Sequence, residues 1–183
     1  MKYLLKNGKD VIIRKPQIDD AEAIIHVIST ADAETRYLAR NPGEFRTSAE
    51  REREIIANIL NDTDSAWFVA EYEGQVVGQC SVGLVRRSER YRHRAEVAFV
   101  ILEAFCNLGI GGKMMEKCIQ WCHDHGVAQL ELTVVADNER AIRMYQGFGF
   151  EIVGTIPRAL GYLDGAYADE YVMVKCIGYN SPD

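Results

Sequence analysis

A run of glycines between an expected strand and an expected helix is the strongest chemical signal in the chain. The strand expected at 95–102 leads into Gly109-Ile110-Gly111-Gly112, and a helix is expected from about 111 to 125. Glycines there allow positive φ angles and a close approach of the backbone to a ligand. The first N–H groups of a helix lack intrahelical acceptors and carry partial positive charge. The turn therefore predicts an anion site that suits a pyrophosphate.

Two other phosphate-binding loops fit this turn less well. A Walker A loop needs Ser or Thr after Gly-Lys, but Met114 follows Lys113, and Asn107 stands where its first glycine belongs. A dinucleotide-binding Gly-x-Gly-x-x-Gly motif would also require glycine in place of Met114. On the glycines alone, a plain strand-to-helix turn without a ligand stays open.

A second stretch, residues 130–150, reads LELTVVADNERAIRMYQGFGF. With the glycine turn, it resembles the GNAT superfamily of acyl-CoA N-acyltransferases. In that family a strand ends in Val-x-x-Asn and is followed by Ala-Ile-x-x-Tyr and Gly-Phe. The resemblance covers roughly residues 11–176, and residues 95–156 are its specific part.

The order of elements predicts an α/β (α+β) fold, with a mixed, mostly antiparallel central sheet flanked by helices on both faces. We expect one GNAT-like N-acetyltransferase domain over residues 1–183. A capping box at Thr47 and Glu50 is expected to start the second helix. The expected strands are 11–14, 66–72, 76–85, 95–102, 130–135, 150–156 and 170–175. The expected helices begin at Asp19–Asp20 and at Thr47, and span about 111–125 and 138–146.

The resemblance implies that acetyl-CoA is the co-substrate. Its pyrophosphate would bind the glycine turn, and its pantetheine arm would pair with the preceding strand, with the Ile101 N–H stabilising the oxyanion. Cys106 departs from the family signature [QR]-x-x-G-x-[GA], which removes a polar side chain but keeps the backbone donors. The implied contacts are Phe99, Val100, Ile101, Asn107, Leu108, Gly109, Ile110, Gly111, Gly112, Asn138 and Tyr145.

Amine acylation needs a base for the ammonium proton and an acid for the leaving thiolate. Tyr145 is the candidate acid, and a core aromatic position is its alternative. It lies seven residues after Asn138, so both side chains share a helix face. Asn138 can cap that helix and also meet the pantetheine arm.

Glu96 is the candidate base, because a partly buried carboxylate there would have a raised pKa and could act through a water. A solvent-facing position or an ion pair with Arg94 is the alternative. Glu131 and Glu151 are further candidates, both expected to be exposed. A covalent route through Cys80 or Cys106 would need a histidine base, and no sequence pattern supplies one.

Composition narrows the class of partner. The net charge is −6 and the pI is about 5.3, so we expect no nucleic-acid partner. The arginine-rich run at 86–94 is interpreted as a solvated loop.

The five cysteines and four histidines show no metal-ligand spacing, so no metal is expected. No apolar run suits a membrane span and no signal peptide is seen, so a cytoplasmic protein is expected.

The sequence therefore predicts an N-acetyltransferase that moves an acetyl group from acetyl-CoA to a small-molecule primary amine, directly, in a ternary complex. The closing segments resemble GNAT members that acylate amino acids or related small amines. A protein N-terminal or lysine acetyltransferase, a non-catalytic acyl-CoA-binding regulatory module and a homodimer stay open. The acceptor is expected between the two N-terminal helices and the C-terminal strands, near Tyr37, Tyr72, Tyr162 and Asp164.

Overall fold

The computed structural model describes residues 1–178 and contains an eight-stranded sheet with four α-helices. The strands are β1 (Lys2–Leu4), β2 (Asp10–Arg14), β3 (Ser65–Tyr72), β4 (Gln75–Leu84), β5 (Arg94–Ile101), β6 (Gln129–Val135), β7 (Glu151–Gly161) and β8 (Tyr167–Cys176). The helices are α1 (Ala21–Glu34), α2 (Ala49–Leu60), α3 (Ile110–Asp124) and α4 (Glu139–Gly147). Short 3-10 turns are η1 (Ile18–Asp20), η2 (Glu89–Tyr91) and η3 (Glu103–Phe105).

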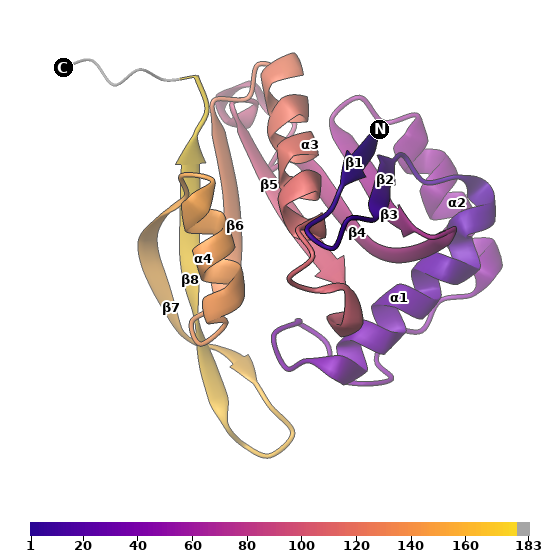
Figure 1. Cartoon of the computed structure of the whole chain (residues 1–183). Helices are drawn as coiled ribbons and strands as arrows, with labels where there is room; N and C mark the ends of the chain where they lie inside the picture. The colour runs from indigo at the N-terminus through magenta and orange to yellow at the C-terminus, as the bar shows by residue number, and fades with distance from the viewer. Residues whose placement is uncertain (179–183) are drawn as a thin grey trace. The chain divides into compact units, whose positions relative to one another are not determined.

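The strand order across the sheet is β1-β2-β3-β4-β5-β6-β8-β7 (Figure 1). β5 pairs with β6 in parallel, whereas β1–β2, β2–β3, β3–β4, β6–β8 and β7–β8 are antiparallel. The predicted mixed, mostly antiparallel sheet is confirmed. The chain divides into two compact units, residues 1–83 with 98–118 and residues 84–97 with 119 onward. A single domain over 1–183 stays a prediction, and residues 179–183 lie outside the described part.

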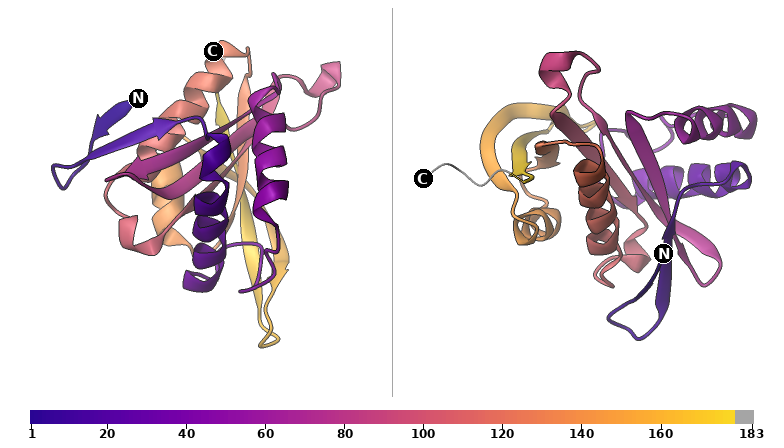
Figure 2. Two further views of the ribbon diagram at one scale, coloured as in Figure 1. Left: turned by 90° about the vertical axis from the view of Figure 1, so that its right-hand side faces the viewer. Right: turned by 90° about the horizontal axis from the view of Figure 1, so that it is seen from above.

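In the first unit, α1 and α2 lie side by side (Figure 2) and bury an apolar stripe against β3. The stripe arises because apolar residues recur at helical spacing. Burying each large aliphatic side chain contributes about 1.5–3 kcal/mol. The core cluster consists of Ala21, Ile24, Ile28, Ile56, Trp67 and Val69.

The opposite face of β3 and β4 is covered by α3. Cys80 on β4 pairs with Phe68, the neighbour of Trp67, so its side chain points away from the α1–α2 cluster. Its Sγ lies 3.7 Å from the Sγ of Cys118 on α3. Helices on both faces of the sheet are thereby confirmed for this unit.

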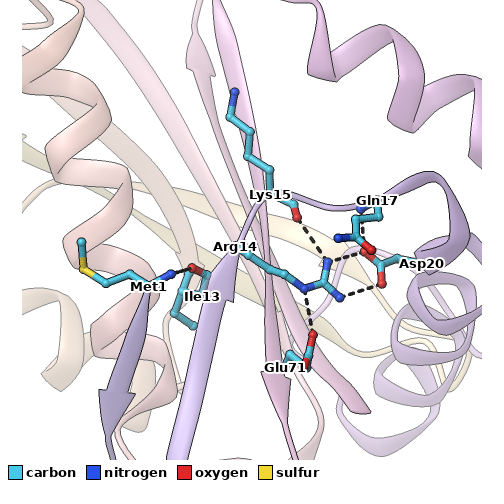
Figure 3. A network of polar contacts seen from close by, with 7 residues as sticks. All are labelled: Met1, Ile13, Arg14, Lys15, Gln17, Asp20 and Glu71. Atoms are coloured by element: carbon cyan, nitrogen blue, oxygen red, sulfur yellow. Dashed lines mark hydrogen bonds and ion pairs between the residues drawn. The ribbon is translucent and has the colours of Figure 1, made fainter. Parts of the chain in front are cut away.

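The junction between β2 and α1 is held by one arginine (Figure 3). Arg14 donates to both carboxylate oxygens of Asp20, at 2.6 and 2.9 Å, and to Glu71 at 2.8 Å. Asp20 also accepts the Gln17 N–H at 2.6 Å. The Arg14 hydrogen bonds lower the pKa of the Asp20 carboxyl group. The network sets where the strand ends and the helix begins.

Two N-terminal details differ from the sequence prediction. The capping box at Thr47 is wrong, because Ser48 is the N-cap of α2 and its Oγ accepts the Arg51 N–H at 3.2 Å. Strand β1 was not predicted, since three residues are too few to show periodicity. Its place is fixed by pairing with β2 and by the Met1 amino group, which donates to the Ile13 carbonyl at 2.7 Å (Figure 3).

In the second unit, β7 and β8 form a longer hairpin than expected. The sequence prediction ended the first of these strands at residue 156. The strand instead continues through an irregularity between Ile156 and Leu160, where Arg158 has a φ of 53°. The Arg158 N–H donates to Asp169 Oδ1 at 2.8 Å. A bulge lets a strand pass a proline that cannot donate a ladder hydrogen bond.

Candidate active site

The glycine turn forms the N-terminal end of α3, within the first unit. Asn107 and Gly109 both adopt left-handed backbone conformations, with φ of 63° and 99°. Lys113 is the first helical residue whose N–H bonds back to the turn, donating to the Gly109 carbonyl at 3.2 Å. The N–H groups of residues 110–112 have no backbone acceptor among residues 1–178. Free donors at the positive end of a helix fit a pyrophosphate.

Two contacts hold the chain that leads into this turn. The Glu34 carboxylate, at the end of α1, accepts the Glu103 N–H at 2.8 Å. The Leu108 carbonyl accepts the Lys6 N–H at 3.3 Å. Sequence reasoning missed both, because each joins segments more than 60 residues apart along the chain. The turn is thus fastened to α1 and to the N-terminal segment.

Tyr72 supports the same region from β3. Its ring packs edge-on against Phe105, with centroids 5.4 Å apart. Its hydroxyl oxygen accepts from Asn7 Nδ2 at 3.1 Å. The residue is 7% exposed. These contacts give Tyr72 a structural role, and its expected role in lining an acceptor site gains no support.

The predicted pantetheine segment is the end of β5. Phe99, Val100 and Ile101 are half-buried and lie in the same unit as the glycine turn. The next residue, Leu102, donates its N–H to the Val77 carbonyl on β4 at 3.0 Å. The structure thus brings the pantetheine segment and the pyrophosphate turn together in one unit. Their contact with the donor stays a prediction.

Asn138 and Tyr145 lie on α4, in the second unit. Asn138 Oδ1 accepts the Ala141 N–H at 3.3 Å, which confirms the predicted N-cap. Tyr145 is 8% exposed, and its ring centroid lies 5.8 Å from that of Phe150. The ring is therefore part of the packed interior. The acid role of Tyr145 and the donor contact of Asn138 stay predictions.

Glu96 is exposed on β5, between the buried residues Ala95 and Val97. The expected partial burial of Glu96 is therefore wrong, because side chains alternate between the faces of a strand. Its base role stays a prediction. The suggested ion pair between Glu96 and Arg94 is also wrong. Arg94 instead binds the carboxylate of Glu131, which lies on the neighbouring strand β6.

Glu131 is a poor candidate for the base. Arg94 Nη2 donates to its Oε2 at 2.6 Å, and Arg94 Nε donates to its Oε1. These bonds lower the pKa of the Glu131 carboxyl group, so it stays ionised and paired. Glu131 is half-buried, contrary to the expectation that it is exposed, whereas Glu151 is exposed as expected.

Cys80 does not have the environment of a nucleophile. Cys80 is 1% exposed, and burial raises the pKa of its thiol well above the usual value. The Cys106 thiol is half-buried and donates to the Leu102 carbonyl at 3.6 Å. A thiolate is the reactive form, so a buried neutral thiol is inert. Within the described chain, no group of three or more His, Cys, Asp or Glu side chains is placed to hold a metal.

The remaining candidates for acceptor lining are divided between the units. Tyr37 is half-buried in the first unit and Tyr162 is half-buried in the second. Asp164 is exposed in the β7–β8 turn, where its Oδ1 accepts the Ala166 N–H at 2.9 Å. This bond explains Asp164 as a turn residue. Acceptor contacts by the two tyrosines stay predictions.

Comparisons with known proteins agree with this architecture. A family model described as "Acetyltransferase (GNAT) family" matches residues 30–150. An L-amino acid N-acetyltransferase of Escherichia coli is 33% identical over 108 residues, which are 58% of this chain and 65% of that protein. The match thus spans slightly less than two thirds of that relative. A phosphinothricin N-acetyltransferase of Streptomyces viridochromogenes is 24% identical over 162 residues, 88% of this chain and 85% of that one.

Solved structures share the whole fold. A GNAT-family acetyltransferase from Streptococcus pneumoniae has a TM-score of 0.85 at 25% identity, covering 92% of this chain and 99% of that one. The yncA protein of Salmonella typhimurium, solved with acetyl-CoA, has a TM-score of 0.80 at 20% identity, covering 94% and 98%.

The chain therefore belongs to the acetyltransferase (GNAT) family, a family of acyl-CoA-dependent N-acyltransferases. The helices of residues 1–178 are each too short or too polar to cross a membrane.

Proposed function

We propose that this protein transfers an acetyl group from acetyl-CoA to the primary amine of a small molecule, with amino acids and related amines as the acceptor class. The observation that carries the proposal is the turn before α3. Two left-handed residues, Asn107 and Gly109, precede a helix whose first N–H groups are free of backbone acceptors. Such a turn suits the two phosphates of the CoA pyrophosphate.

The reaction can be written with the residues of this chain. The ammonium group of the acceptor loses a proton, through a water, to the Glu96 carboxylate, and the neutral nitrogen attacks the thioester carbonyl carbon. The Ile101 N–H stabilises the resulting oxyanion. The C–S bond then breaks, and the CoA thiolate takes the Tyr145 hydroxyl proton. The acylated nitrogen gives its extra proton to the Tyr145 phenolate, which restores the hydroxyl. The products are the N-acetylated amine and free CoA, formed in one ternary complex without a covalent enzyme intermediate.

The acceptor class is supported by the names of relatives. The E. coli relative acts on L-amino acids by name, and the Streptomyces relative acts on phosphinothricin. Cys80 is buried, and burial raises the pKa of its thiol. A neutral, buried thiol supports direct transfer over a mechanism with a cysteine-bound acyl intermediate. A thiol-release assay that includes peptides would reveal a protein acceptor. Calorimetry combined with the same assay would reveal binding of acetyl-CoA without transfer.

The test is calorimetric titration with acetyl-CoA, followed by a thiol-release assay over amino acids, polyamines and peptides. Asn107→Asp places a negative charge in the turn while keeping the side-chain size and the left-handed tendency. We expect it to weaken acetyl-CoA binding at least about tenfold, most strongly at low salt. Asn61→Asp, on the exposed C-cap of α2, is the control with the same change of charge.

Three results would contradict parts of the proposal. Absence of acetyl-CoA binding by the unsubstituted chain would remove the donor site. Binding without thiol release by any amine would indicate a regulatory module. Thiol release in the presence of peptides but not of amino acids would indicate that the acceptors are proteins.

A further inference from the structure

Gly78 on β4 makes an unusually close approach to the end of β5. A Cβ atom at this position would lie 2.9 Å from the Val100 carbonyl oxygen and 3.1 Å from Ile101 Cγ1. It would also lie 3.3 Å from Ile101 Cα. Two of these three atoms are backbone atoms, so a side-chain rotation cannot relieve the contact. Any larger residue at 78 must displace the backbone of residues 100–101.

The glycine is required for space and not for backbone conformation. Gly78 is buried and lies outside the set of residues with positive φ. Gly109, by contrast, has a φ of 99°, and a Cβ there would meet nothing within 4 Å. Ala at position 78 would therefore not be strained by a positive φ, and its effect would come from the collision with β5.

A bulge directly before Gly78 makes a second contact between β4 and the end of β5. In the β3–β4 pairing, Ala70 faces Gly78 and Glu71 faces Val76, so Val77 is an extra residue in β4. The carbonyl of this extra residue accepts the Leu102 N–H at 3.0 Å. Bulges commonly re-aim groups next to functional sites. Residues 100–102 are thus set by two consecutive residues of β4.

We infer that Gly78 is a positioning residue for the thioester of the acyl donor. It acts through the Ile101 N–H, and the inference rests on the proposed function, in which that N–H stabilises the oxyanion. Oxyanion donors must lie within a few tenths of an ångström of their target to be effective. The close approach of β4 holds the Ile101 amide at that position, while the separate turn at 107–112 binds the pyrophosphate.

Gly83→Ala is a matched control for Gly78→Ala. Gly83 is on the same strand, and a Cβ there would lie 2.9 Å from Ser65 Cβ, on β3 instead of β5. Both substitutions add one methyl group at a close contact within β4, and both are expected to lower stability. Only Gly78→Ala displaces the proposed thioester segment.

The experiment compares both variants with the unsubstituted chain in three measurements. These are kcat and KM with acetyl-CoA, calorimetric affinity for 3′-phospho-ADP (the nucleotide part of CoA), and the amide NMR shifts of residues 100–102. For Gly78→Ala we expect kcat to fall at least about tenfold. We expect its affinity for 3′-phospho-ADP to change less than about twofold, and the three amide signals to move. For Gly83→Ala we expect kcat within about twofold and unmoved signals.

Equal losses of kcat in both variants, or an unchanged kcat in Gly78→Ala, would overturn the positioning role. Unmoved amide signals in Gly78→Ala would overturn it as well. If the unsubstituted chain neither binds acetyl-CoA nor turns over, the proposed function itself fails. That result is read from the unsubstituted chain alone, so the two failures are distinguished.

Discussion

The carboxylate of Asp32, on the last turn of α1, is fully buried and forms a two-point ion pair with Arg40. Arg40 Nε lies 2.8 Å from Oδ2, and Nη2 lies 3.1 Å from Oδ1. The Arg40 guanidinium also stacks over the Phe45 ring at 5.3 Å, and Phe45 packs against the core of the first unit. The pair therefore fastens the connection between α1 and α2 to the end of α1.

Loss of this arginine is expected to destabilise the protein strongly. Arg40→Ala would leave the Asp32 charge buried without a partner, at a cost of about 3 kcal/mol in the free energy of unfolding. Urea denaturation measures this change. Arg51→Ala removes an exposed pair with Glu54, and we expect a change below about 1 kcal/mol. Equal changes in the two variants would contradict the importance of burial at Asp32.

Glu52 on α2 is expected to make stability depend on pH. It is 3% exposed, and burial raises the pKa of its carboxyl group. No hydrogen bond or ion pair of this carboxyl group is present within residues 1–178. The unfolded chain therefore releases the Glu52 proton at a lower pH than the folded chain does. Between the two pKa values the folded state binds more protons, so the free energy of unfolding falls as pH rises through this window.

Glu52→Gln removes this titration. Relative to the unsubstituted chain, we expect the variant to gain stability as pH rises from about 4.3, the ordinary pKa of Glu. The gain should level off above the folded-state pKa. Thermal melts from pH 4 to pH 8 measure the difference, and the exposed Glu54→Gln is the control. A stability difference that is the same at every pH would show that Glu52 does not titrate abnormally.

The two roles assigned to Asn138 can be separated by two substitutions. Asn138→Ala removes the cap of α4 and is expected to lower the free energy of unfolding by about 1 kcal/mol. Asn138→Asp keeps the capping oxygen but loses the amide N–H donor. We expect it to retain stability and to bind acetyl-CoA more weakly, as measured by calorimetry. Full donor affinity in Asn138→Asp would leave only the capping role.

The acid role of Tyr145 predicts a loss of turnover without a loss of binding. Tyr145→Phe keeps the ring and its packing against Phe150, but it removes the hydroxyl proton. We expect kcat to fall about 100-fold while the Kd of acetyl-CoA changes less than about twofold. Tyr91→Phe, in the arginine-rich connection of the same unit, is the control. Turnover within about twofold of the unsubstituted chain would rule out the acid role.

Local pattern was enough to predict most elements and the glycine turn before α3. Three features depend only on residues close together in the chain, and the sequence therefore shows them directly. They are the glycines within 109–112, the cap at Asn138 and the periodic apolar residues of α1. The predicted end of β7, at residue 156, falls short of the observed end at Gly161. The bond from Arg158 to Asp169 joins residues on two strands and leaves no local signal.

The sequence by itself thus determined the family, the order of the helices and of the strands after β1, and the residue types available for chemistry. Only the tertiary structure decided which carboxylates are paired, buried or exposed. Arg94 binds Glu131 and leaves Glu96 exposed, because the parallel pairing of β5 with β6 places Glu131 across from that segment. The same holds for Gly78, whose spatial requirement depends on the approach of Val100 from another strand. Such distances between residues far apart in the chain follow from packing, which no local pattern encodes.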